Sequence, residues 1–287
     1  MKTVLFCGGQ GMRIREFSEA IPKPMIPIGR RPILWHLMSY YAQYGHKDFV
    51  LCLGYRSSVI RHFFTSDRPQ VFEECAISGF RCENATAVDA HDDCCVALAD
   101  TGIDSNIGER LVAVTEHVKD EEMFLANYAD GLCDVDLNSM IDTFRRSNKV
   151  ACFLAVRPTF SMHLIGFGES GRLCGFHSAK DADLWINGGF FIMRPEIFGY
   201  IRAGEDLVSE PFSRLIAEDK LLAYRHEGFW CAMDTLKDRQ HLEQLINGGS
   251  MPWIKPSPHS DPRSSQESVF RASVGRAEHL ALNVPLA

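Results

Sequence analysis

The stretch Thr3-Val4-Leu5-Phe6-Cys7-Gly8-Gly9-Gln10-Gly11-Met12-Arg13, with Pro22-Lys23-Pro24 shortly after it, decides the expected fold. The apolar run at 3–7 predicts a buried strand that ends in a glycine-rich turn. The three glycines can adopt positive φ and let main-chain N–H groups approach an anion without an intervening Cβ. Arg13 then supplies a forked cation and Lys23 a compact one. Together these residues predict a binding site for a polyphosphate.

Two better-known phosphate loops do not fit this spacing. A Walker A loop needs Lys-Ser or Lys-Thr directly after its last glycine, whereas Met12 and Arg13 follow here. The dinucleotide fingerprint needs a third glycine near position 13 and an unbroken helix, but Pro22 and Pro24 interrupt the segment. The alternative is a glycine-rich turn without a ligand, which the neighbouring arginine, lysine and prolines make less favoured.

Composition limits the class of protein. A chain of 287 residues with 46% hydrophobic content can bury a full core, and it favours one α/β domain with elaborations. The net charge of -7 provides no basic surface for an extended nucleic acid, although local cations can hold a small anion. No apolar run approaches the roughly 18 residues of a membrane span, and Met1-Lys2 leads into a strand rather than a signal peptide. We therefore expect a cytoplasmic protein without nucleic-acid or membrane partners.

The ten cysteines could indicate disulfides or a metal site. No Cys-x-x-Cys pair occurs, and several cysteines lie in apolar, strand-like runs, where a free thiol behaves as a small hydrophobe. Reduced and mostly buried thiols are therefore favoured over a zinc site. The adjacent pair Cys94-Cys95 leaves redox chemistry open at one place.

Strand-like and helical segments alternate along most of the chain. Strands are expected at 3–7, 49–53, 123–127, 150–156, 189–193 and 221–225, a hairpin around 166–171, and helices at 32–45, 56–64, 136–147 and after Pro195, Ser209 and Thr235. This order predicts an α/β fold with a Rossmann-like, mixed but mostly parallel sheet and helices on both faces. We expect one domain at 1–254 with an insertion at 65–95, and a mobile tail at 255–287.

Two acidic residues follow expected strands. Asp130 comes just after the strand at 123–127, and Asp234 lies in a turn between a strand and a helix. In an open α/β sheet, ligands bind at the carboxyl ends of the strands. A bound polyphosphate needs a divalent ion, and Mg²⁺ takes one or two carboxylates plus phosphate oxygens. The pair therefore predicts a Mg²⁺ site, the alternatives being a turn residue at Asp130 and a helix-capping acid at Asp234.

The chain resembles the sugar-phosphate nucleotidyltransferases, with the nearest likeness in their glucose-1-phosphate cytidylyltransferase branch. The resemblance covers about residues 1–254 in the same order. It rests on Gly8 to Arg13, Pro22 to Pro24, Asp130-Gly131, Pro32 to His36, Asp48 to Val50, Asp100 to Leu111, Trp185 to Phe191 and Gly228 to Thr235. It implies transfer of a nucleotidyl group, with CTP favoured, to a sugar 1-phosphate, with release of pyrophosphate, and relatives of this kind are often homo-oligomers.

The resemblance also implies roles for individual residues. Arg13 would stabilise the departing pyrophosphate, Lys23 would hold the α-phosphate, and Asp130 and Asp234 would hold Mg²⁺. Gly8 would approach the base. The other residues implied to meet the nucleotide are Gly9, Gly11, Met12 and Arg110, and those implied to meet the sugar phosphate are Lys180, Asn187 and Gly188.

Two departures from the family pattern keep alternatives open. Met12 stands where the family has threonine before the arginine. The family carries Glu-Lys-Pro shortly after the phenylalanine that corresponds to Phe176, whereas this chain has His-Ser-Ala-Lys there, so the glutamate is missing and Lys180 comes one place late. The alternatives are UTP or dTTP as donor, an acceptor other than glucose 1-phosphate, or a nucleotide-sugar sensor without catalysis.

Overall fold

The computed structural model describes residues 1–9, 11, 21–65, 80–82, 94–159, 163–178 and 183–255. The chain divides into two units, Met1–Ile254 and Lys255–Ala287, and the helices and strands of the described residues all belong to the first. The expected tail at 255–287 lies outside the described residues apart from Lys255, as does most of the expected insertion at 65–95.

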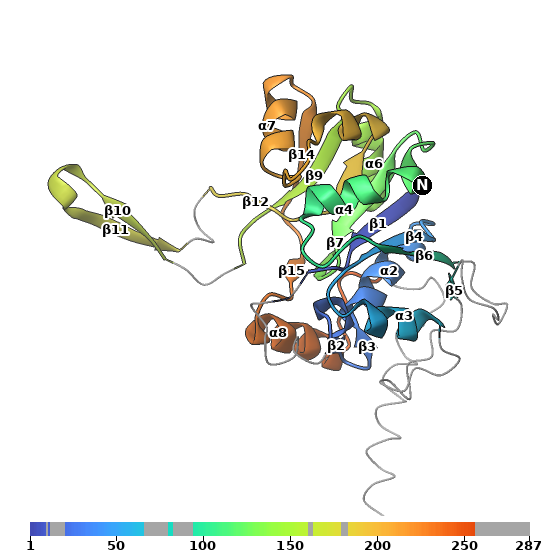
Figure 1. The fold of residues 1–287 in the computed structure, drawn as a ribbon. Coiled ribbons are helices and arrows are strands. Elements are labelled where there is room, and N and C mark those ends of the chain that lie inside the picture. Colours follow the sequence, from blue (N-terminus) through green and yellow to red (C-terminus); the bar gives the residue numbers. More distant parts are fainter. Residues whose placement is uncertain are drawn as a thin grey trace, which may run out of the picture. The chain divides into compact units, whose positions relative to one another are not determined.

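Nine strands of the described residues form one sheet (Figure 1). Five strands on one side of the sheet are parallel, in the order β7, β1, β4, β6 and β5, with β5 at the edge. The bounds are β1 Lys2–Phe6, β4 Asp48–Leu53, β5 Phe80–Cys82, β6 Cys94–Asp100, β7 Phe124–Tyr128, β9 Ala151–Val156, β12 Ile186–Asn187, β13 Phe191–Met193 and β14 Leu221–His226. Because parallel strands end on the same side, the segments after β1 and β7 meet at one edge of the sheet.

The remaining strands make the sheet mixed. Strand β13 lies antiparallel between β7 and β9, β12 pairs antiparallel with the end of β9, and β14 runs parallel to β9 along its full length. Three two-stranded sheets complete the fold. They pair β2 (Pro27–Ile28) with β3 (Arg31–Pro32), β8 (Gly131–Cys133) with β15 (Trp230–Ala232), and β10 (His163–Phe167) with β11 (Leu173–Ser178).

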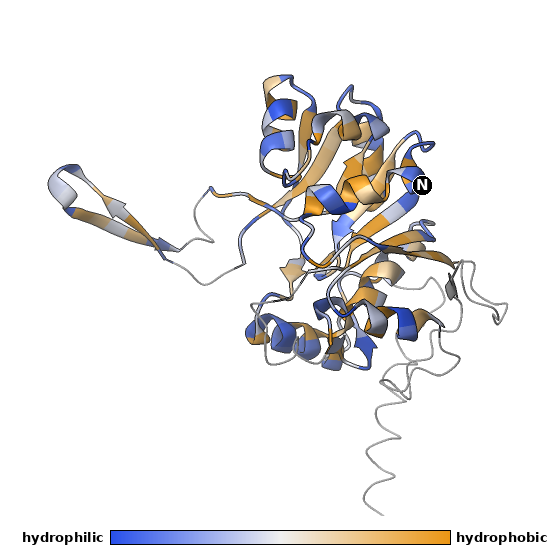
Figure 2. Cartoon of the chain, viewed as in Figure 1, coloured by the Kyte–Doolittle hydropathy of each residue, from blue (hydrophilic) through white to orange (hydrophobic). Residues whose placement is uncertain are grey.

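Side chains of the central strands pack on two sides of the sheet. Along β1, Val4 belongs to one hydrophobic cluster and Leu5 to another, as the alternation of side chains along a strand requires. Figure 2 shows these strands as mainly hydrophobic. A sheet buried on both faces explains why the strands read as nearly continuous apolar runs in the sequence.

Helices cover both clusters. Helices α2 (Ile33–Gln43), α3 (Ser57–Thr65), α6 (Leu137–Arg145) and α8 (Leu236–Asn247) contribute to the cluster of Leu5. Helices α4 (Ile107–Ala113), α5 (Thr115–Val118), α7 (Glu210–Ala217) and the 3-10 helix η4 (Pro195–Tyr200) contribute to that of Val4. Two short 3-10 helices, η2 (Lys23–Met25) and η3 (Glu169–Gly171), lie in connections. Capping boxes start α4 at Asn106 and α8 at Thr235.

The predicted α/β class and mostly parallel sheet are confirmed. The hairpin expected around 166–171 is the β10–β11 pair. Some details differ. The segment after Pro195 is a 3-10 helix, the strand expected at 189–193 begins only at Phe191, and β6 and α4 are among the elements that were not predicted. Gly189 has a φ of +78°, which explains the late start of β13.

Six cysteines are free thiols, and all of them except Cys174 are buried, as their apolar surroundings predict; the six are Cys7, Cys52, Cys133, Cys152, Cys174 and Cys231. Cys94 is buried and Cys95 is partly buried. None of the helices that the structure describes has the length and apolar character of a membrane span.

Candidate active site

A cleft of about 340 Å³ lies at the carboxyl edge of the sheet, beside the ends of β1 and β7. Its walls are Phe6, Gly9, Gly11, Lys23, Pro24, Ser105, Asn106, Ile107, Arg110, Tyr128, Ala129, Asp130, Asp206 and Asp234. The structure therefore brings together six residues that the sequence assigned to ligand binding, from four distant segments. Arg13 and Met12 lie outside the described residues, so their roles stay predictions.

Lys23 lies between the two predicted metal ligands. Its Nζ atom is 2.6 Å from Oδ2 of Asp130 and 2.7 Å from Oδ1 of Asp234. Pro22 and Pro24 hold the lysine at the start of the one-turn helix η2, so the side chain leaves a rigid segment. Burial alone would lower the pKa of Lys23, but the two carboxylates outweigh it, and the pKa is raised above its ordinary value. The ammonium therefore keeps its charge.

The two-stranded β8–β15 sheet holds Asp130 and Asp234 next to each other. Asp130 precedes β8, Asp234 follows β15, and the N–H of Met233 donates to the carbonyl of Asp130 at 2.9 Å. Asp234 does not cap helix α8, since Thr235 and Asp238 form that capping box. Asp234 lies in the wall of the cleft, and its side chain is 38% exposed. The helix-capping alternative for Asp234 is wrong.

Arg110 is a buried residue that supports the loops at the wall of the cleft. It is 2% exposed, and its guanidinium donates to the carbonyls of Gly8 at 3.1 Å and Gly102 at 2.8 Å. It also donates to the carbonyls of Leu53 and Ile103 and to the hydroxyl of Thr101. These bonds tie the glycine-rich loop after β1 to the loops after β4 and β6. A Cβ on Gly8 would meet Nη1 of Arg110 at 2.0 Å, so any larger residue there would have to displace the buried guanidinium.

Residues 2–238 match the family model described as Nucleotidyl transferase. The chain belongs to this family. A glucose-1-phosphate cytidylyltransferase of Salmonella typhi is 36% identical over 257 residues, which cover 88% of this chain and 98% of the relative. A UTP--glucose-1-phosphate uridylyltransferase of Synechocystis is 24% identical, over 75% of this chain and 55% of the relative.

Solved structures share the fold of this nucleotidyl transferase. A UDP-glucose pyrophosphorylase complexed with UDP-glucose superimposes with a TM-score of 0.62 at 13% identity, covering 86% of this chain and 98% of the other. HddC from Yersinia pseudotuberculosis gives a TM-score of 0.59 at 16% identity, covering 85% of this chain and 99% of the other.

The segment predicted to meet the sugar lies beside the cleft of this nucleotidyl transferase rather than in its wall. Asn187 accepts a hydrogen bond from the N–H of Gly189 at 2.9 Å, and its amide nitrogen is 3.4 Å from the hydroxyl of Tyr128, which does line the cleft. The carbonyl of Gly188 accepts from the indole of Trp230 at 2.9 Å. Lys180 lies outside the described residues, so its predicted contact with the sugar phosphate stays a prediction.

Four polar residues of the cleft were missed by sequence reasoning: Ser105, Asn106, Tyr128 and Asp206. Asn106 is recognisable as a helix cap, because Glu109 stands three residues later. Burial, together with the charge of Asp206, raises the pKa of Tyr128 to about 12. Its hydroxyl therefore stays protonated and can donate a hydrogen bond to a ligand. Nothing in the sequence near Asp206 indicates the cleft.

The cleft offers the parts that phosphoryl transfer needs. Glycine-loop amides and a charged lysine suit phosphate oxygens, and two carboxylates converge on one cationic position. Carboxylate oxygens without sulfur or imidazole suit a hard cation such as Mg²⁺. The donor set therefore fits the metal that the sequence predicts.

Proposed function

We propose that this nucleotidyl transferase moves a nucleotidyl group, CMP from CTP, to the phosphate of a sugar 1-phosphate and releases pyrophosphate. The observation that carries the proposal is the position of Lys23, held between Asp130 and Asp234 at the glycine-rich loop. A lysine balanced by two acids beside a phosphate loop suits a reaction in which charge moves along a triphosphate.

Mg²⁺ is part of the proposal. Asp130 and Asp234 would hold it, and the bound ion would neutralise charge on the phosphates. Because both acids now contact the ammonium of Lys23, the lysine would turn from them toward the α-phosphate when the nucleotide enters. Mg²⁺ would then balance the two acids, and the ammonium of Lys23 would balance charge on the α-phosphate during the in-line displacement.

The chemical step needs positioning more than covalent help. A phosphate oxygen of the sugar phosphate attacks the α-phosphorus of the nucleotide, a new P–O bond forms, and the bond to the β-phosphate breaks. Lys23 would stabilise charge on the α-phosphate, and Arg13 would stabilise the departing pyrophosphate. Asn187 and Gly188 would bind the sugar from the side of Tyr128.

CTP is the favoured donor because the chain matches a cytidylyltransferase over nearly its whole length. UTP is the second candidate, because the chain is also similar, at lower identity, to a uridylyltransferase, and dTTP is a third. Residues Gly8, Gly9 and Gly11 would accommodate the nucleotide, with Met12 beside them and Arg110 holding the loop. A homo-oligomeric state and a cytoplasmic location belong to the same proposal.

The test is release of pyrophosphate from CTP, UTP, dTTP, ATP and GTP, each combined with several sugar 1-phosphates and Mg²⁺. We expect the highest turnover with CTP. Asp130→Asn and Asp234→Asn should each lose most of that turnover while remaining folded. Asp142→Asn is the control, because Asp142 is an exposed acid paired with Arg145 on α6.

Each outcome of this test is informative. No pyrophosphate from any combination, with nucleotide binding retained, would support a non-catalytic sensor instead. Near-normal turnover of either cleft variant at saturating Mg²⁺ would remove that aspartate from the metal site.

A further inference from the structure

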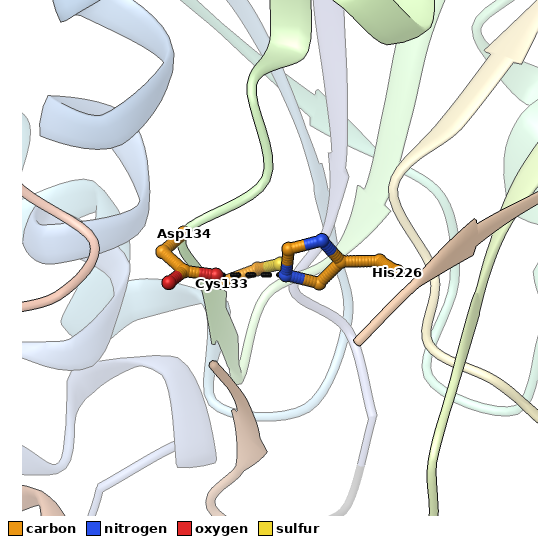
Figure 3. Close-up of side chains that lie close together, drawn as sticks. All are labelled: Cys133, Asp134 and His226. Atoms are coloured by element: carbon orange, nitrogen blue, oxygen red, sulfur yellow. Dashed lines mark hydrogen bonds and ion pairs between the residues drawn. The ribbon is translucent and has the colours of Figure 1, made fainter. Parts of the chain in front are cut away.

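Cys133, Asp134 and His226 form a second cluster of possible metal ligands, outside the walls of the cleft (Figure 3). One ligand atom from each lies within 4.8 Å of the others. Figure 3 shows the carboxyl group of Asp134 and the imidazole of His226 pointing toward one another, with the sulfur of Cys133 beside the ring. Nε2 of His226 is 2.7 Å from Oδ1 of Asp134.

The backbone holds the three side chains together. Cys133 is the last residue of β8 and His226 the last of β14, so each leaves a strand end. The N–H of Asp134 donates to the carbonyl of Phe229 at 3.1 Å, which closes the loop between β14 and β15 over the cluster. A Cβ on Gly228 would lie 2.5 Å from Oδ1 of Asp134 and 2.7 Å from Nε2 of His226. The loop therefore needs glycine to pass this close.

The donor atoms differ in kind from those of the cleft. One sulfur, one imidazole nitrogen and one carboxylate oxygen suit Zn²⁺, whereas Mg²⁺ prefers oxygen alone. A cysteine thiolate and an aspartate would also balance the charge of a divalent ion, so the loaded site would be neutral. That suits its position, because the side chain of His226 is 15% exposed and that of Asp134 is 35% exposed.

We propose that Cys133, Asp134 and His226 bind one Zn²⁺ ion at a site separate from the Mg²⁺ site, with a water molecule as the fourth ligand. Ligand atoms on one zinc ion lie about 3.3 to 3.6 Å apart in tetrahedral geometry. Binding thus needs the Asp134–His226 contact to open slightly and the sulfur to approach. The partly exposed carboxyl group of Asp134 provides the path by which an ion enters.

Protons balance in this step. Because a carboxylate only accepts, the contact with Asp134 places the ring proton of His226 on Nε2. When zinc binds Nε2, that proton moves to Nδ1, and the thiol proton of Cys133 leaves to solvent. Burial raises the pKa of Cys133 well above its ordinary value, so without an ion the residue is a neutral thiol. The thiol of Cys133 therefore releases one proton for each ion bound.

The ion would join two parts of the fold. Strand β8 pairs with β15, whereas β14 belongs to the large sheet through β9. A zinc ion between Cys133 and His226 would fasten the small β8–β15 ladder, which also fixes Asp130 and Asp234, to the large sheet. Since the folded chain alone holds the three ligands together, zinc should raise the apparent melting temperature by mass action.

The experiment uses the full chain, stripped of metals with a chelator and titrated with Co²⁺ and, separately, Zn²⁺. We expect one Co²⁺ per chain with a thiolate-to-cobalt charge-transfer band in the near ultraviolet, and a higher melting temperature with Zn²⁺. Cys133→Ser should lose the band, and Cys133→Ser and His226→Gln should each bind about tenfold more weakly or worse. Cys174→Ser is the matched control, because Cys174 is an exposed thiol outside the cluster.

The outcomes decide the proposal independently of catalysis. The band should survive in the double variant Asp130→Asn with Asp234→Asn, which separates this site from the cleft. Loss of the band in Cys174→Ser, an unchanged band in Cys133→Ser, or no bound ion at micromolar zinc would each overturn the assignment. If Cys133→Ser does not fold, circular dichroism will show it, and His226→Gln then carries the comparison.

Discussion

Nζ of Lys23 lies 2.6 Å from Oδ2 of Asp130, so a lysine from the first loop of the chain neutralises an acid that follows β7. Their side chains are 12% and 24% exposed, which leaves limited room for water between them. Without a ligand, this contact keeps Asp130 and Asp234 from repelling each other.

Lys23→Gln should therefore destabilise the protein as well as slow its reaction. The substitution leaves two carboxylates without a shared cation, and we expect the free energy of unfolding to fall by about 2 kcal/mol. Urea unfolding at neutral pH measures the change. Lys149→Gln is the control, because Lys149 pairs with Asp219, an acid that is 92% exposed, and such a pair contributes about 1 kcal/mol or less. Equal losses in the two variants would contradict the shared-cation interpretation.

Gly8→Ala and Gly9→Ala should differ sharply in stability. The new Cβ at position 8 would overlap the guanidinium of Arg110, whereas at position 9 it meets no atom within 4 Å. We expect Gly8→Ala to lower the melting temperature by several degrees, since Arg110 must give up hydrogen bonds to move. Gly9→Ala should melt like the wild type. Thermal unfolding followed by circular dichroism is sufficient, and similar melting temperatures for both variants would show that Arg110 moves freely.

Trp230→Phe should affect the sugar side of the site alone. The substitution keeps an aromatic ring but removes the N–H that donates to the carbonyl of Gly188. Losing such a bond costs about 1 kcal/mol, so KM for the sugar phosphate should rise several-fold. KM for CTP should stay unchanged. Trp35→Phe serves as control, because Trp35 lies on α2 and stacks with Arg31. A change confined to KM for CTP would refute this role.

His36 should make the protein sensitive to acid. Burial, with the nearby charge of Arg31, lowers its pKa from 6.5 to about 4, against the opposing hydrogen bond to Ile28. Because the unfolded chain takes up the proton first, stability is full above pH 6.5 and falls as the pH drops toward 4. The loss reaches at most about 3 kcal/mol for this group.

His36→Gln should remove that part of the acid slope. Urea unfolding at pH 7 and at intervals down to pH 4.5 measures it. His163→Gln, on the exposed strand β10, should keep the slope of the wild type. The same slope in all three proteins would mean that other groups cause the loss.

Local chemistry made much of this structure predictable. The capping box of Thr235 and Asp238 and the rigid Pro22-Lys23-Pro24 segment follow from neighbouring residues alone. Asp130 was predictable because ligands gather where parallel strands end. A sequence shows the type of a side chain but not the direction in which it points. Arg110 was therefore expected near the nucleotide, whereas its hydrogen bond to the carbonyl of Gly8, which supports the glycine-rich loop, was not expected.

Residues that meet only through tertiary structure escaped sequence reasoning. Asp206 reaches the cleft from a connection between η4 and α7, with no nearby motif. Cys133 and His226 lie far apart in the chain and share no metal-binding spacing, so the sequence did not predict that they would meet.

The pairing of β8 with β15 also has a consequence for biosynthesis. Strands β1, β4, β6 and β7 all lie in the first half of the polypeptide, so a ribosome-bound chain can assemble the middle of the sheet early. Asp234 and the hydrogen bond from Met233 to Asp130 come only from residues translated much later. With the proposed roles of Asp130 and Asp234, we expect a prematurely terminated chain that lacks the segment beyond β15 to fail to turn over substrate even where the middle of its sheet has formed.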